Sequence, residues 1–291
     1  GAILGTSGLV SLVYGFNQAE ELGWGANRTM AFLGAAAILL VSFVLFERKS
    51  DHPLLPMRIV TNRNRSGAYI AVLIQYMTMF ASFFFMTYFM QNVLGFSPIK
   101  SGLAFLPMPL MVTFMAQVSS RLIQRIPTRM MIAPGLFIGA LGMAWLTQLR
   151  PDSSYWVHVA PSLALMGLGL GLVIVPAIST ATNGASPSDA GVASAMVNTS
   201  QQIGASIGTS LLGTIAASAS TDYFKTHAEL AVGSAASIVH GYNVASAWGA
   251  GMLIAGSVVA AVLINVGRPN AATSPQQQTA TADPEPMVAH V

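Results

Sequence analysis

Long stretches without a charged side chain are the feature that most constrains the fold of this 291-residue chain. Residues free of Asp, Glu, Lys and Arg fill eight segments: 1–19, 29–46, 66–99, 101–120, 130–149, 153–188, 190–221 and 230–267. A helix needs about 20 largely apolar residues to cross about 30 Å of hydrocarbon. Each segment is long enough or nearly so. The sequence therefore predicts eight transmembrane helices.

Composition excludes several other classes of protein. Only 8% of the residues are charged, against about 25% in an ordinary soluble domain, so a soluble globular enzyme is excluded. A β-barrel would show strands of alternating polarity, whereas residues 33–46 and 163–175 are nearly continuous apolar runs. Backbone groups in lipid must pair internally, which leaves helices. We expect an all-α integral membrane protein.

The basic residues predict an orientation. With residue 1 on the cytoplasmic side, nine Lys and Arg side chains lie in inside segments and four in outside segments. This is the positive-inside bias, and the opposite topology would invert it. Trp24, Tyr155, Trp156 and Tyr242 fall at the proposed outer ends, where interfacial aromatic residues gather. The C-terminus is then cytoplasmic.

The loops divide the chain into four parts. Residues 47–65 form a long basic loop in which Pro53 and Pro56 interrupt any continuous helix. We expect two transmembrane helices in 1–46, this cytoplasmic loop at 47–65, a six-helix bundle in 66–267 and a disordered cytoplasmic tail at 268–291. The chain starts with Gly1 inside an apolar run, so we expect it to be a piece of a longer protein.

No motif for a cofactor, metal or nucleic acid appears. The net charge of +3 is too small for a nucleic-acid interface. The chain contains no Cys, its five His have no metal-ligand spacing, and no phosphate-binding loop occurs. An integral membrane enzyme should carry clustered acids or histidines near one membrane face. We therefore expect no metal, no cofactor and no enzymatic activity.

Polar side chains inside the predicted helices are the best pointers to function, because hydrocarbon penalises unpaired amides. The candidates for a substrate path are Gln75, Tyr76, Gln91, Asn198, Gln201 and Gln202, and Gln117 is a further intramembrane amide. Gln75 lies in an aromatic helix and has two interpretations. It lines a cavity able to stack flat ligands, or it bonds a neighbouring helix while the phenylalanines face lipid.

Small residues recur on one face of the seventh predicted helix. Ser200, Gly204 and Gly208 follow at intervals of four, which lets a neighbouring helix approach closely. Ordinary helix packing explains this face. Rocking of one helix bundle against another would use the same smooth face.

Two segments resemble the major facilitator superfamily. The loop Arg121–Arg129 resembles that family's G-x-L-x-D-R-x-G-x-R signature in keeping Leu122, Arg125 and Arg129, with Ser120, Gln124 and Pro127 as replacements. In the family this loop is a cytoplasmic latch, which assigns Arg121, Gln124, Arg125 and Arg129 to that role. The positive-inside rule alone would also explain the arginines.

The second resemblance is to fourteen-helix drug:proton antiporters. It rests on residues 187–208, where Pro187 and Asp189 precede A-G-V-A-S, N-T and Q-I-G, and on Gly102–Pro107, Leu54-Leu55-Pro56 and Val13-Tyr14-Gly15 with Trp24. The resemblance implies the last eight helices of such a transporter: two linker helices plus the C-terminal six-helix bundle.

This resemblance also implies a function. It suggests a proton-driven exporter of amphipathic drugs or metabolites in the plasma membrane. Its partners are then the lipid bilayer, a missing N-terminal six-helix half, a small amphipathic substrate and protons. None of the predicted helices contains a charged residue, so the proton-carrying group is expected in the missing half. An uptake symporter, an exporter of a native lipid or amino acid, and a non-transporting scaffold remain alternatives.

Overall fold

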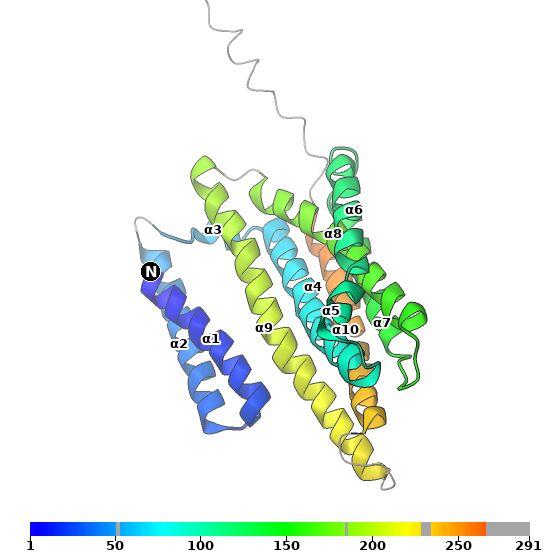
Figure 1. Ribbon diagram of the computed structural model, residues 1–291. Coiled ribbons are helices and arrows are strands. Elements are labelled where there is room, and N and C mark those ends of the chain that lie inside the picture. Colours follow the sequence, from blue (N-terminus) through cyan, green and yellow to red (C-terminus); the bar gives the residue numbers. More distant parts are fainter. Residues whose placement is uncertain (51–52, 184–185, 228–233, 266–291) are drawn as a thin grey trace, which may run out of the picture.

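The computed structural model describes residues 1–50, 53–183, 186–227 and 234–265, and these form helices joined by short loops (Figure 1). The long helices are α1 (Ala2–Leu22), α2 (Asn27–Lys49), α4 (Arg63–Tyr88), α6 (Pro107–Leu122), α7 (Arg129–Leu146), α8 (Ala160–Thr182), α9 (Pro187–Thr226) and α10 (Ala235–Leu263). Shorter pieces are α3 (Met57–Val60), α5 (Pro98–Ala104) and two π-helical turns, η1 (Phe89–Val93) and η2 (Tyr155–Val159). The all-α fold class is confirmed.

Seven of these helices, not eight, are long and apolar enough to cross a membrane within the described ranges. The helix outside that set is α1, which has 21 residues. Polar side chains such as Thr6, Ser7, Ser11 and Asn17 lower its hydropathy. It nevertheless packs along α2, so the first predicted transmembrane segment forms a helix but is not among the seven candidate spans.

The bundle is organised around α4. This helix contacts α9, α10 and α8, while α7 packs between α8 and α10, and α6 packs on α8. The α1–α2 pair lies to one side and touches the bundle through α9 (Figure 1). Hydroxyl groups make that contact: Ser206 and Ser210 of α9 donate to the backbone oxygens of Val13 and Phe16, at 3.5 and 2.6 Å.

Side-chain caps and prolines set several helix ends. The side chain of Asn62 accepts hydrogen bonds from the backbone of Asn64 and Arg65 at the start of α4, and Ser97 caps α5 just before Pro98. These residues pair backbone donors that a helix start leaves free. The loop predicted at 47–65 contains the short helix α3, which begins after Pro56.

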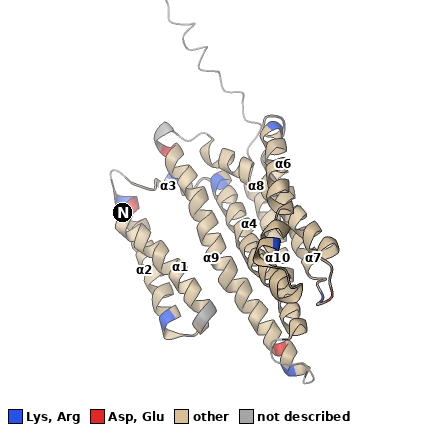
Figure 2. Ribbon diagram, in the orientation of Figure 1, with Lys and Arg blue, Asp and Glu red and all other residues tan. Residues whose placement is uncertain are grey.

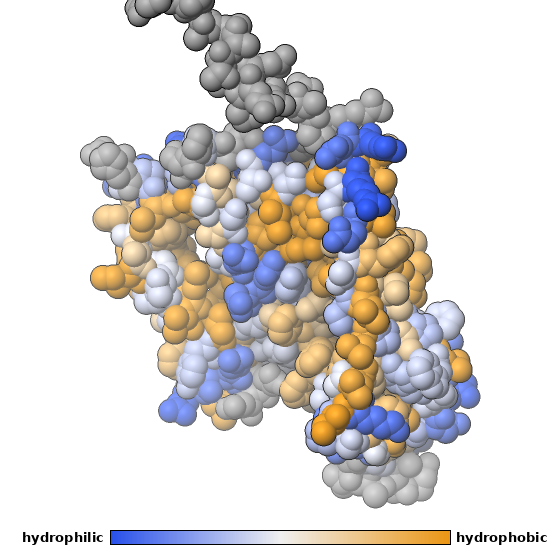
Figure 3. Space-filling model, turned by 45° about the horizontal axis from the view of Figure 1, so that its top comes forward, coloured by the Kyte–Doolittle hydropathy of each residue, from blue (hydrophilic) through white to orange (hydrophobic). Residues whose placement is uncertain are grey.

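Charges collect at the helix ends and apolar side chains cover the sides (Figure 2). Large exposed hydrophobic side chains occur on every long helix from α1 to α8 and on α10, and much of the side surface is hydrophobic (Figure 3). A surface of this kind fits a lipid environment. The predicted tail at 268–291 lies outside the described residues.

Candidate functional site

The small-residue face of α9 lies directly against α4. A Cβ atom added to Gly204 would lie 2.3 Å from the backbone oxygen of Leu73, and one on Gly208 would lie 1.9 Å from that of Met77. Ser200 is buried on the same face and donates to the backbone oxygen of Met196. Only glycine allows the two backbones to approach this closely. The contact fixes the rotation of α9 about its own axis.

That rotation turns a polar face of α9 outward. Asn198 and Gln202 are exposed, and so are Gly191 and Ala195 at the same helical spacing. Gln201 lies between this exposed face and the buried one and is half-buried. Figure 3 shows hydrophilic surface midway along this side, in the region of α9.

The depth of the two exposed amides is unusual for a lipid-facing surface. At 1.5 Å per residue, Asn198 and Gln202 lie about 16 and 22 Å from the start of the 40-residue helix α9. Amide groups at such depth need water or protein as a partner. The α9 face, defined here as Gly191, Ala195, Asn198 and Gln202, can therefore line a path or an interface.

Gln75 occupies the opposite kind of environment. Its side chain is 0% exposed and lies in the interior between α4, α7 and α10, near Gly139 and with Leu253 close by. Neither its Oε1 nor its Nε2 has a hydrogen-bond partner among the residues that the structure describes. Of the two interpretations from the sequence, this burial favours packing between helices.

The other path candidates do not join one site. Tyr76 is half-buried and stacks with Phe80, with ring centroids 6.3 Å apart. Gln91 lies in the π-helical turn η1, at the end of α4 rather than in its middle. Gln117 is exposed on α6. The structure thus separates amides that the sequence grouped by type alone.

An aromatic pocket of about 290 Å³ lies between α4, α9 and α10, near the end of α4. Phe85 stacks with Tyr242 at 4.7 Å between ring centroids, and Tyr88 meets the same ring edge-on at 6.1 Å. Phe84 also lines the pocket. Sequence patterning placed Tyr242 at an interface but gave no sign that it meets the aromatic residues of α4.

The predicted latch loop lies between α6 and α7. Arg121, Gln124 and Arg125 are exposed, and Arg129 is half-buried at the start of α7. Within the described ranges these arginines form no ion pair. The loop is thus available to a partner that the described residues do not supply.

An ion pair that the sequence did not predict joins α3 to the start of α9. Arg58 donates from Nε and Nη2 to the two carboxylate oxygens of Asp189, at 2.9 and 3.0 Å. Asp189 is buried and Arg58 is largely exposed. Nearby, Arg65 donates to the backbone oxygen of Asn183, and Tyr69 to that of Ala193. These contacts fasten the start of α4 and the preceding loop to the α8–α9 connection.

The described residues contain no group of three or more His, Cys, Asp or Glu that could hold a metal ion.

Comparison with known proteins identifies relatives that match three quarters or more of this chain. The puromycin resistance protein of Streptomyces alboniger is 39% identical over 91% of this chain and 53% of its own length. The cephamycin export protein of Amycolatopsis lactamdurans is 36% identical over 75% of the chain and 45% of its own length. The tetracenomycin C resistance and export protein of Streptomyces glaucescens is 31% identical over 77% and 41%. The chain thus spans about half the length of these relatives.

The family model of the Major Facilitator Superfamily matches residues 1–209. This match covers α1 to α8 and the first half of α9, including the α9 face and the contact of Gly204 and Gly208 with α4. The resemblance seen in the sequence is therefore confirmed, and a family of transport proteins agrees with the expectation that the chain is not an enzyme. This multi-pass membrane chain belongs to the Major Facilitator Superfamily.

Proposed function

We propose that this chain is the C-terminal part of an exporter of amphipathic drugs or metabolites, and that the α9 face lines its substrate path. The exposed pair Asn198 and Gln202, about 16 and 22 Å from the start of α9, carries the proposal. Relatives named for puromycin resistance and cephamycin export support the kind of cargo.

The chemistry of the α9 face fits such cargo. Amide groups both donate and accept hydrogen bonds and carry no charge. They can therefore hydrogen-bond a polar group of an amphipathic molecule without binding it tightly. Gly191 and Ala195 leave the surface beside them flat. The tight contact of Gly204 and Gly208 with α4 lets α9 and α4 move as one body.

The proposed assembly follows the expected division of the chain. Residues 1–46 are two linker helices, 66–267 form the C-terminal bundle, and a further six-helix half supplies the other wall of the path. The arginine-rich ends lie in the cytoplasm, as does the C-terminus, by the positive-inside bias. The membrane is the plasma membrane. Protons drive export through a titratable group in the other half, because the middles of the described helices carry no charged side chain.

The cytoplasmic contacts have a proposed role as well. The loop carrying Arg121, Gln124, Arg125 and Arg129 latches against the other half. The pair formed by Arg58 and Asp189 holds the linker to the bundle as it moves.

Drug efflux from cells that produce the full-length protein tests this function. Puromycin is the probe, because a 39% identical relative is named for resistance to it. Wild type should lower cellular puromycin and raise resistance. The double variant N198L/Q202L should reach the membrane but lose most of the efflux, whereas Gln202→Asn, which keeps an amide, should retain most of it.

If the double variant exports puromycin as well as wild type, the α9 face does not line the substrate path. If wild type handles neither puromycin nor a panel of other amphipathic antibiotics, uptake transport or a scaffold role becomes the better account.

A further inference from the structure

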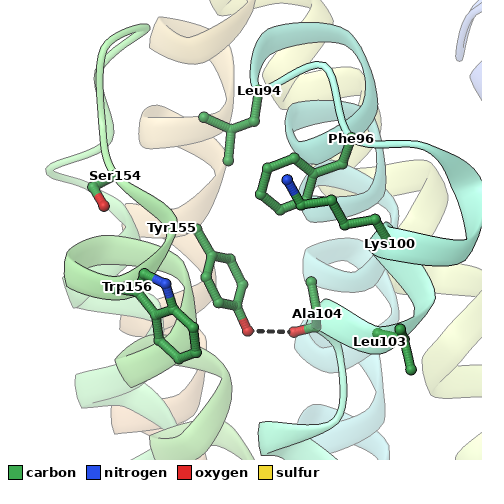
Figure 4. Close-up of a pocket in the computed structure, with 8 residues that line it drawn as sticks. All are labelled: Leu94, Phe96, Lys100, Leu103, Ala104, Ser154, Tyr155 and Trp156. Carbon is green, nitrogen blue, oxygen red and sulfur yellow. Dashed lines mark hydrogen bonds between the residues drawn. The ribbon is translucent and has the colours of Figure 1, made fainter.

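A pocket of about 470 Å³ lies between the start of α5 and the turn η2 (Figure 4). The arginine-rich loop follows the other end of α6. The loop before α5 and the start of α5 form one wall, and the turn η2 forms the other. Tyr155 donates to the backbone oxygen of Ala104 at 2.7 Å, which ties the two walls together. Phe96 lies 6.0 Å and Trp156 5.1 Å from the Tyr155 ring, between ring centroids.

One lysine provides the charge of this pocket. Lys100 Nζ lies 3.8 Å from the centroid of the Phe96 ring and forms no ion pair with any residue that the structure describes. The ring face attracts the ammonium group, but it does not neutralise it. An apolar, aromatic pocket with an unneutralised cation favours an anionic ligand. A cationic ligand is disfavoured because the Lys100 ammonium group already lies over the face of the Phe96 ring.

An apolar track leads away from the pocket along α5 and α6. Leu103, Leu106, Leu110 and Phe114 follow at helical spacing, and their exposed fractions are 60%, 47%, 61% and 58%. From Leu103 to Phe114 the track is about 16 Å long. One leaflet of hydrocarbon is about 15 Å thick, half of the bilayer core. The track therefore matches the length of one lipid chain.

The position of the pocket agrees with a lipid headgroup. Trp156, 76% exposed, and Tyr155 line it, and such side chains gather at headgroup level in membranes. A phosphate beside Lys100 would meet the one charged side chain among the described residues that line the pocket.

We propose that this pocket and track form a binding site for one anionic phospholipid. Its phosphate lies at Lys100, its glycerol backbone lies against the rings of Phe96, Tyr155 and Trp156, and one acyl chain follows the track from Leu103 to Phe114. On the orientation proposed above, the lipid belongs to the outer leaflet. The site is separate from the α9 face and does not depend on the cargo.

Brominated lipids test the site in the full-length protein. The protein is reconstituted in phosphatidylcholine vesicles that contain increasing amounts of either brominated phosphatidylglycerol or brominated phosphatidylcholine. The signal of Trp156 is the difference in fluorescence quenching between wild type and Trp156→Phe. Phosphatidylglycerol should quench this signal at a lower mole fraction than phosphatidylcholine.

Matched variants isolate the charge. Lys100→Gln should raise the half-quenching mole fraction of phosphatidylglycerol about fivefold, the effect of one lysine near an anionic lipid surface. Arg150→Gln removes one positive charge at the same end but outside this pocket, and it should leave the value unchanged. Lys100→Arg should restore it. Soluble glycerol phosphate should not compete, because it lacks the acyl chain.

Four results would overturn the proposal. They are equal quenching by the two lipids, equal shifts in Lys100→Gln and Arg150→Gln, and displacement by glycerol phosphate, which would indicate a site for free phosphate. The fourth is a Trp156 signal that neither lipid quenches, which would show that the other half of the protein covers the pocket. A thermal unfolding midpoint equal to that of wild type shows that each variant is folded.

Discussion

Gln75 on α4 and Gln202 on α9 are both amides within charge-free stretches, yet the fold gives them opposite surroundings. Gln75 is fully buried toward α7 and α10, and no described residue pairs with its amide. Gln202 is exposed on a surface that also carries Asn198. The contact of Gly204 and Gly208 with α4 sets this difference, because it fixes which side of α9 is hidden. The side to which each amide points, more than its residue type, decides whether it packs between helices or can line a path.

The largest effect should come from filling that glycine contact. Gly208→Ala places a Cβ atom 1.9 Å from the backbone oxygen of Met77, so α9 must move away from α4. Overpacking of a tight contact costs about 1–3 kcal/mol and can exceed that where backbone must shift. We expect a clear fall in the thermal unfolding midpoint and in folded yield in detergent.

Gly191→Ala is the matched control, since it lies on the same helix with no atom within 4 Å of the new Cβ. It should leave the midpoint unchanged or raise it slightly, because alanine favours helix. Equal midpoints for the two variants would mean that α9 does not lie against α4 as described.

Replacement of the buried amide should have a smaller effect of the opposite sign. Gln75→Leu removes two unpaired polar atoms from an apolar interior. A buried unpaired polar group costs about 1–3 kcal/mol, so the variant should unfold at a higher temperature than wild type, with efflux preserved. A lower midpoint would show that the amide has a partner, such as an internal water, that it loses in the variant.

The ion pair at the cytoplasmic end should give the smallest change in stability. Arg58 is 68% exposed, and solvent screens exposed pairs. A double-mutant cycle of Arg58→Gln and Asp189→Asn should show a coupling that weakens with added salt. If the two single effects simply add, the pair contributes nothing to the attachment of α3.

Most of the helices could be predicted from where the charges fall. The gap at 29–46 became α2 (Asn27–Lys49), and the gap at 130–149 became α7 (Arg129–Leu146). Charged groups mark these ends because they avoid hydrocarbon. The first gap gave the helix α1, which is not among the seven candidate membrane spans of the described residues.

The site could be predicted only in part. Spacing identified Ser200, Gly204 and Gly208 as one face, since helical periodicity is local. The side to which Gln75 or Gln202 points depends on which neighbour that face meets, and no local pattern contains this information. The pair of Arg58 and Asp189 joins residues 131 positions apart, and the single acid near Pro187 gave no hint of its partner.

Cysteine labelling tests the central claim most directly, that the α9 face lines the path while Gln75 lies in the packed interior. This chain contributes no cysteine, and Gln202→Cys and Gln75→Cys are compared in the full-length protein in membranes, with the labelling of the unsubstituted protein as the background. A water-soluble maleimide should label Gln202→Cys quickly, puromycin should slow that labelling, and Gln75→Cys should stay unlabelled. Labelling of Gln75→Cys that puromycin protects, together with an unreactive Gln202→Cys, would contradict this account and place the path on the other side of α4.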